Sequence, residues 1–230
     1  MLVIDTEKRL MFNLRMRIWK MLEESSKPIF IAIAGGSASG KSTISEKLVK
    51  HLNSFGIKSS LFMCDNYYFA PLAAADQQNI PKRAIRNGWG YNISNADRIK
   101  QVNWDNPSAL DIDSIEFDLD ELSHGKEIKY PSYKFSDSQP LPFTQPAQVY
   151  VVDGLYLLNK TLMLTSNFDI KVFVHTDLLT RTKRRMKRDE NRLKVSSWST
   201  FWRSVRQVEP GFYRHVYGSR YNADIWFRSK

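Results

Sequence analysis

The sequence predicts an α/β fold, in which a parallel β-sheet carries helices on both of its faces. Short apolar runs rich in β-branched residues recur along the chain, amphipathic helical patterns separate them, and the first run leads into a glycine-rich turn. Runs without polar alternation are typical of strands buried in a parallel sheet, because helices cover both faces. Strands that alternate with helices return in parallel to one sheet, and ligands then bind at the carboxyl ends of its strands.

The size and composition favour one domain with a buried core. The chain has 230 residues, of which 42% are hydrophobic and 25% are charged, so disordered, collagen-like and low-complexity chains are excluded. We expect a single domain over 1–230. Within it we expect an N-terminal helix in 1–25, an insertion on the substrate side at 66–147 and a basic helical lid at 177–195.

The cysteine content and the hydropathy predict a cytoplasmic protein without a membrane partner. Cys64 is the single cysteine and cannot form an internal disulfide, and no Cys/His cluster has the spacing of a zinc site. No apolar stretch approaches the ~18 residues that a membrane span requires. The first residues carry acidic side chains and lack the apolar run of a secretory signal.

The first elements surround the glycine-rich turn. Apolar residues at helical spacing predict an amphipathic helix over 6–22, packed on the main body. The apolar run 29–34 predicts a buried strand, and the helix that follows the turn covers 44–52. A second strand is expected at 61–64, with Asp65 at its carboxyl end.

The later part of the chain is predicted to begin with an irregular segment. Residues 66–107 contain several Asn and Gly residues, which favour turns and loops. A helix over 109–123 and a proline-rich hairpin or loop should follow. The remaining expected elements are strands at 149–152 and 170–174, helices at about 177–191 and 197–216, and a short strand at 223–227.

The turn after the first strand matches the phosphate-binding motif G-x-x-x-x-G-K-[ST] in full. Glycines let backbone N–H groups fold around an anion, and the following helix adds its positive N-terminal end. Lys41 can then reach the β and γ phosphates of ATP, while the Ser42 hydroxyl supplies one ligand to Mg²⁺. A glycine-rich turn without a ligand is the alternative. The motif consists of Gly35, Gly36, Ser37, Ala38, Ser39, Gly40, Lys41, Ser42 and Thr43.

Nucleotide binding alone leaves the reaction open, because motors, GTPases, helicases and small-molecule kinases share this loop. The guanine signature Asn-Lys-x-Asp is missing, since Asn159 and Lys160 are followed by Thr161 and Leu162. This argues against a GTPase. The chain is also short for the second motor domain of a helicase, so a small-molecule kinase is favoured.

Two aspartates at strand ends are candidates for the chemistry of such a kinase. Asp65 follows the strand after the loop helix and should project above the phosphates, where it could act as general base for a substrate hydroxyl. Asp153 follows the apolar strand 149–152 and could hold Mg²⁺ through water. For each of them, capping a turn or a strand end is the alternative.

The positive charge lies at the end of the chain. Residues 181–230 hold 14 Lys and Arg against 4 Asp and Glu, and so carry the whole net charge of +10. Guanidinium groups on one helix face repel one another unless anions lie between them, which predicts a lid that faces phosphates. A nucleic-acid surface and a solvated helix face are the alternatives. The four arginines on this face, at i, i+3, i+4 and i+7, are Arg181, Arg184, Arg185 and Arg188.

Taken together, these motifs resemble the uridine kinase (uridine-cytidine kinase) family of P-loop phosphotransferases, which is similar to phosphoribulokinase and to bacterial pantothenate kinase. The resemblance covers about residues 28–227. Beyond the loop it rests, in chain order, on Asp65-Asn-Tyr-Tyr68, Trp104 to Asp111, Tyr130 to Phe135, Asp153-Gly154, Thr176 to Asp189 and Tyr221 to Ile225.

The resemblance implies an ATP- and Mg²⁺-dependent kinase that phosphorylates the 5′-hydroxyl of a nucleoside such as uridine or cytidine. By this resemblance Asp65 would be the base for that hydroxyl. Asp105 would hold the 2′ and 3′ hydroxyls with help from Arg185, since one carboxylate accepts two hydrogen bonds. Arg188 would steady the phosphates. A turn before Pro107 is the alternative role for Asp105.

The resemblance also implies aromatic residues in the nucleoside site. Tyr133 would line this site, and Tyr68 is expected to contact the substrate. A core or surface aromatic is the alternative for Tyr133.

The chain departs from the family pattern where the base would be read. Ser138 stands where the family commonly has His, and Arg203 stands where Gln is expected. Leu193-Lys194-Val195 replaces the usual Arg-Gly-Arg of the lid. A kinase of the same fold that acts on pantothenate, a sugar or a phosphosugar is therefore the first alternative. A P-loop NTPase that binds nucleic acid is the second, and a homo-oligomer stays open.

Overall fold

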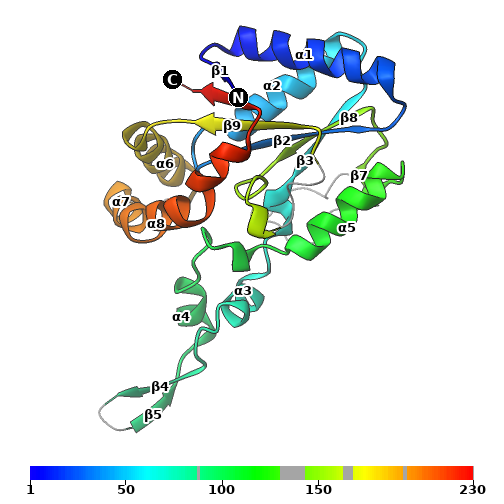
Figure 1. Cartoon of the computed structure of the whole chain (residues 1–230). Helices are drawn as coiled ribbons and strands as arrows, with labels where there is room; N and C mark the ends of the chain where they lie inside the picture. The colour runs from blue at the N-terminus through cyan, green and yellow to red at the C-terminus, as the bar shows by residue number, and fades with distance from the viewer. Residues whose placement is uncertain (87–88, 130–142, 163–167, 194–195, 230) are drawn as a thin grey trace.

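The computed structural model describes residues 1–86, 89–129, 143–162, 168–193 and 196–229. Six parallel strands form one sheet at its centre, with the order β1-β10-β9-β2-β8-β3 (Figure 1). This confirms the predicted α/β fold with a parallel sheet. The strands are β1 (Leu2–Ile4), β2 (Ile29–Gly35), β3 (Ser59–Met63), β8 (Val149–Asp153), β9 (Ile170–His175) and β10 (Ile225–Arg228).

Helices cover both faces of the sheet (Figure 1). On β2, Ile31 and Ile33 pack toward α1 and α2, while Phe30 and Ala32 belong to a second apolar cluster with residues of α5. Successive side chains of a strand point to opposite faces, so an apolar run without alternation needs cover on both sides. The helices are α1 (Glu7–Glu24), α2 (Lys41–Ser54), α5 (Ile112–Ser123), α6 (Leu178–Leu193), α7 (Ser197–Arg203) and α8 (Glu209–Gly211).

The N-terminal segment forms the predicted amphipathic helix and one strand that was not predicted. Leu10, Leu14 and Ile18 of α1 are fully buried against the sheet, which confirms the expected packing. The short strand β1 pairs with β10 at the edge of the sheet. Three residues are too few for a periodicity to be read from the sequence, so tertiary pairing alone reveals this strand.

The prediction of an irregular segment over 66–107 is wrong. The structure has a short 3₁₀ turn at Cys64–Tyr67, and Ser94 caps one of two helices by accepting a hydrogen bond from the Asp97 N–H at 3.1 Å. Asn79, with φ 53°, lies in the turn after the first of these helices, a conformation that Asn tolerates. The other elements are α3 (Pro71–Gln77), the hairpin strands β4 (Arg83–Arg86) and β5 (Trp89–Asn92), and α4 (Asn95–Lys100), and the hairpin extends away from the sheet (Figure 1).

The helix expected over 109–123 begins later, because the Asp111 side chain accepts a hydrogen bond from the Ser114 N–H and thereby caps α5. The expected hairpin after α5 is present as β6 (Ile128–Lys129) paired with β7 (Phe143–Thr144).

The helix expected at 197–216 is continuous, but π-helical turns lie on either side of α8, at Ser204–Val208 and Phe212–Val216. Pro210 lies between them and has no N–H for an α-helical hydrogen bond. Among the helices that the structure describes, none combines the length and the apolar character needed to cross a bilayer.

Candidate active site

The phosphate-binding loop lies between the end of β2 and the start of α2, as the motif predicts. Gly35 has φ 150° and Gly40 has φ 95°, values that favour glycine. A side chain on Gly35 would collide with the carbonyl oxygen of Val174 on the neighbouring strand β9. A side chain on Gly36 would come within 2.5 Å of the Arg181 guanidinium and 2.9 Å of the Phe212 ring. These two glycines therefore let β9 and the C-terminal helices close directly around the loop.

Lys41 is buried at the head of α2, where its ammonium group donates a hydrogen bond to the Gly36 carbonyl oxygen at 3.1 Å. This contact folds the lysine back over the loop. The loop is also fixed from outside, because the Thr176 hydroxyl donates to the carbonyl oxygen of Ser39 at 2.9 Å. The head of the loop helix thus carries a buried positive charge within the turn that would surround an anion.

The two predicted aspartates lie at the same edge of the sheet as the loop. Met63, the last residue of β3, pairs with Asp153, the last residue of β8, and Asp65 follows two residues after Met63. The charge of Lys41 acts on both carboxylates. The parallel topology therefore brings together the lysine and both aspartates that the sequence singled out.

The surroundings of Asp65 favour its protonated form. Crowding by protein atoms raises the pKa of this carboxyl, although the side chain still reaches solvent. The positive charge of Lys41 opposes this effect, and the negative charge of Asp153 adds to it. A carboxylate with a raised pKa is a stronger base than an ordinary aspartate, as a proton acceptor in catalysis should be.

Asp153 and Ser42 form a pair of oxygen ligands that fits Mg²⁺. Burial raises the pKa of the Asp153 carboxyl, whereas the charge of Lys41 and the nearby Ser42 hydroxyl lower it. The Oδ1 atom of Asp153 is buried and has no hydrogen-bond partner among the residues that the structure describes. Within the described part of the chain, no three His, Cys, Asp or Glu residues are grouped as a metal site. The arrangement suits an ion that takes its other ligands from phosphates and water, as Mg²⁺ commonly does.

Asp105, Arg185 and Ser37 come together from three distant parts of the chain. The two terminal nitrogens of Arg185 donate to the two Asp105 oxygens at 3.3 and 3.2 Å, and one of them also donates to the Ser37 hydroxyl at 2.9 Å. Asp105 and Arg185 are both buried. The structure thus joins the loop, the segment after α4 and helix α6, and it brings together Asp105 and Arg185, which the family resemblance had placed in one site.

Two other arginines of α6, the helix predicted as a lid, contact groups of the protein itself. Arg181 donates to Glu209 at 2.6 Å, and its guanidinium lies 3.9 Å from the centre of the Phe212 ring. Arg184 donates to the Ser39 carbonyl oxygen at 3.3 Å. We expected phosphates of a ligand to lie between these arginines. In the structure, carboxylates of the protein itself pair with Arg181, Arg185 and Arg188.

Asp189 is the centre of an ion-pair network that was not predicted. Its carboxylate is fully buried and accepts hydrogen bonds from Arg188 at 3.1 Å and from Arg203 at 2.6 Å. The Nε atom of Arg185 lies 3.8 Å from the same carboxylate. The network joins α6 to α7. A signal for it was present in the sequence, because Arg188 and Arg185 stand one and four residues before Asp189.

We expect Asp189→Asn to lower the free energy of unfolding by about 2 kcal/mol, because it leaves Arg188 and Arg203 without their shared anion. Urea unfolding followed by circular dichroism measures the change. The matched control is Glu190→Gln, which alters the exposed neighbouring acid and should leave the midpoint nearly unchanged. Equal midpoints for wild type and Asp189→Asn would show that the network does not stabilise the fold.

Of the two predicted aromatic residues, Tyr68 lies within the described structure and Tyr133 lies outside it. Tyr68 is buried edge-on against Trp104, with 6.0 Å between ring centres. Burial raises the pKa of Tyr68, and the charge of Asp65 raises it further, so the phenol stays protonated near the candidate base. The base-reading position 138 and lid positions 194 and 195 also lie outside the described residues.

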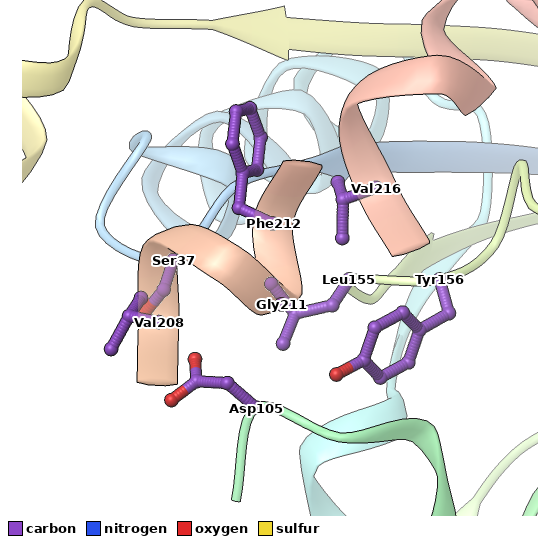
Figure 2. A pocket seen from close by; sticks show the side chains of 8 residues that line it. All are labelled: Ser37, Asp105, Leu155, Tyr156, Val208, Gly211, Phe212 and Val216. Carbon is purple, nitrogen blue, oxygen red and sulfur yellow. The ribbon is translucent and has the colours of Figure 1, made fainter. Parts of the chain in front are cut away.

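Asp105, which pairs with Arg185, also lines a small cavity of about 10 Å³ (Figure 2). The sequence motifs assign no role to Tyr156 and Gly211, which both line this cavity. The position of Tyr156 soon after the carboxyl end of β8 was a usable signal, since ligands of such sheets bind there. The lining residues are Ser37, Asp105, Leu155, Tyr156, Val208, Gly211, Phe212 and Val216.

The comparison with protein families decides which proteins this chain is related to. A sequence model of the Phosphoribulokinase / Uridine kinase family matches residues 30–229, which is most of the chain. The chain belongs to this family. Membership confirms the family that the motifs predicted, and with it the enzyme class of a kinase.

Named members of the family are similar along nearly the same length. A uridine kinase of Lactobacillus helveticus is 29% identical over 209 residues, covering 89% of this chain and 88% of the relative. A uridine kinase of Clostridium perfringens is 30% identical over 202 residues and covers 86% of each chain. Uridine-cytidine kinase B of Dictyostelium discoideum is 28% identical over 204 residues, covering 87% of this chain and 74% of the relative.

Solved structures with low sequence identity share the fold of this family member. A candidate fructose transport system kinase from Silicibacter sp. TM1040 superposes with a TM-score of 0.71 at 17% identity, over 93% of this chain and 98% of the other. D-glycerate 3-kinase from Cryptococcus neoformans superposes with a TM-score of 0.60 at 11% identity, over 92% and 89%. At these identities the likeness concerns the fold alone.

Proposed function

We propose that this family member is an ATP- and Mg²⁺-dependent kinase that phosphorylates the 5′-hydroxyl of a nucleoside, with uridine and cytidine as the first candidates. The relatives named uridine kinase and uridine-cytidine kinase support the acceptor. The observation that carries the reaction is the shared position of Asp65 and Lys41, whose charge acts on the Asp65 carboxylate across the head of the loop helix.

Each residue of the site would have a separate role in the phosphoryl transfer. The backbone N–H groups of the loop and the ammonium group of Lys41 would bind the phosphates of ATP. Asp65 would take the proton of the acceptor hydroxyl while the acceptor oxygen bonds to the γ phosphorus and the bond to the β phosphate oxygen breaks. Ser42 and Asp153 would hold Mg²⁺, which when bound neutralises charge on the phosphates.

The acceptor would be held by the buried Asp105–Arg185 pair. Both oxygens of Asp105 already accept hydrogen bonds from Arg185, but each carboxylate oxygen has a second lone pair. The 2′ and 3′ hydroxyls of a ribose can therefore donate to Asp105 while Arg185 keeps its contacts. Arg188, fixed by Asp189, acts electrostatically on Asp65, which supports a place for its guanidinium near the phosphates.

A kinase of the same fold for another hydroxyl substrate is the second candidate. It is favoured by Arg203, which stands at the position expected to read the base but donates its hydrogen bond to Asp189. The nucleic-acid alternative is less well supported, because Arg181, Arg185 and Arg188 bind carboxylates of the protein.

An acceptor panel tests the proposal. Purified protein is incubated with ATP and Mg²⁺ in the presence of uridine, cytidine, purine nucleosides, pantothenate, sugars or phosphosugars, and the phosphorylated product is identified by mass. We expect transfer to the 5′-hydroxyl of a pyrimidine nucleoside. Transfer to a non-nucleoside alone would select the second candidate and reject the first.

A further inference from the structure

The Tyr156 hydroxyl is a buried polar group that the proposed mechanism leaves unused. Only 2% of the residue is exposed, and its hydroxyl makes no hydrogen bond with any described residue. Figure 2 shows the phenol pointing into the cavity that Asp105 and Ser37 also line. A buried hydroxyl without a partner is unfavourable, and the ring itself packs in an apolar cluster and edge-on against His215, contacts that do not use the hydroxyl. The hydroxyl therefore points to a ligand group.

The character of that group follows from the two side chains around it. An ionised Asp105 can only accept hydrogen bonds, and a protonated phenol can donate one. Burial first, and then the charges of Asp105 and Asp65, raise the pKa of Tyr156, so its phenol stays protonated. A ligand hydroxyl can accept from the phenol, and a ligand hydroxyl or a water can donate to the carboxylate, so a neighbouring pair of hydroxyls fits both side chains. Carbonyl, ether and fluorine atoms cannot donate, and an ammonium group cannot accept.

We propose that Tyr156 is a specificity-determining residue, whose hydroxyl donates a hydrogen bond to the 2′- or 3′-hydroxyl of the ribose held by Asp105. This inference rests on the proposed function and adds to it one residue, Tyr156, that contributes to the recognition of a ribose hydroxyl. The cavity, of about 10 Å³, has room for about one water. A water at this place can satisfy Tyr156 in the free enzyme and leave when the sugar hydroxyl enters.

The test combines Tyr156→Phe with acceptors that lack one hydroxyl. Steady-state kinetics are measured for wild type and variant with uridine, 2′-deoxyuridine and 3′-deoxyuridine at saturating ATP. With uridine we expect kcat/KM of the variant to fall about 3- to 10-fold, the effect of one neutral hydrogen bond, while the KM for ATP is unchanged. With the deoxynucleoside that lacks the recognised hydroxyl, wild type and variant should be equal, because the contact is already lost.

Tyr150→Phe is the matched control. Tyr150 is also fully buried, but its hydroxyl accepts a hydrogen bond from the Ala147 N–H at 2.9 Å. Its loss should lower the melting temperature without changing the ratio of uridine to deoxyuridine turnover.

Each outcome decides one question. Equal losses of the Tyr156→Phe variant on all three acceptors, or no loss on uridine, would overturn the role of Tyr156 and leave the kinase proposal intact. If the variant does not fold, equal kcat/KM of the wild type for uridine and both deoxynucleosides overturns it instead. Absence of turnover of every nucleoside by the wild type rejects the proposed function, and the ribose contact with it.

Discussion

Asp65→Asn is expected to lower kcat by roughly 10² to 10⁴, the contribution of a general base, with little change in ATP affinity. The amide has the shape of the carboxyl but cannot take the proton of the acceptor hydroxyl. ATP binding depends on the loop and Lys41, so the nucleotide should bind as before. Turnover is measured by product formation, and ATP affinity by isothermal titration. Stability should not fall, because the raised pKa of Asp65, caused mainly by desolvation, means that the fold disfavours its ionised form.

The same residue predicts a pH dependence. Desolvation by the surrounding protein atoms raises the pKa of Asp65. The carboxyl of Asp65 therefore stays protonated up to a higher pH than an ordinary aspartate does. We expect kcat to fall on acidification through this raised pKa, which lies above the usual aspartate value of 3.8. In Asp65→Asn the remaining activity should lose this acidic limb.

Asp113→Asn provides the control, since this exposed aspartate in the first turn of α5 lies outside the proposed site. It should keep both the turnover and the pH profile of the wild type. Nearly normal kcat in Asp65→Asn would remove Asp65 from the role of base and leave only nucleotide binding supported.

Lys41→Ala is expected to lower kcat/KM for ATP by about 10² to 10³, as the loss of one donor to developing charge does in other sites. The side chain makes one hydrogen bond within the protein, to the Gly36 carbonyl oxygen, so its removal takes away charge stabilisation more than packing. The free energy of unfolding should change little. Initial rates at varied ATP concentration and urea unfolding measure both quantities.

The control lies two turns further along the same helix. Lys47 is exposed and pairs with Glu7 at 2.6 Å, so Lys47→Ala removes a lysine of α2 without touching the loop. Its kcat/KM should match the wild type. If Lys41→Ala retained wild-type kcat/KM while still binding ATP, the lysine would have no part in the transfer.

The elements that could be predicted are those whose signal is local and repeated. The strand at Ile29–Gly35 was identified from one apolar run, and α1 from apolar residues at helical spacing. The loop between β2 and α2 was identified because its glycines, lysine and serine are adjacent in the chain. Asp65 and Asp153 could be placed in the same site because parallel strands end at one edge of the sheet.

The predictions that were wrong concern segments whose structure depends on short elements or on contacts with residues far away in the sequence. The elements between Tyr68 and Trp104 are short, so their periodicity is too brief to separate them from loop. The arginines of α6 showed a common face, but not that Glu209, Asp105 and Asp189 would bind them.

By itself, the sequence determined the family, the parallel sheet and the nucleotide loop, because each depends on residues that are neighbours along the chain. Only the tertiary structure decided that Arg185 pairs with Asp105, that Asp189 joins α6 to α7, and that the Tyr156 hydroxyl is buried without a hydrogen-bond partner among the described residues. Such contacts join residues far apart in sequence, and their energies depend on burial and distance. Neither quantity is defined until the sheet and its covering helices have packed.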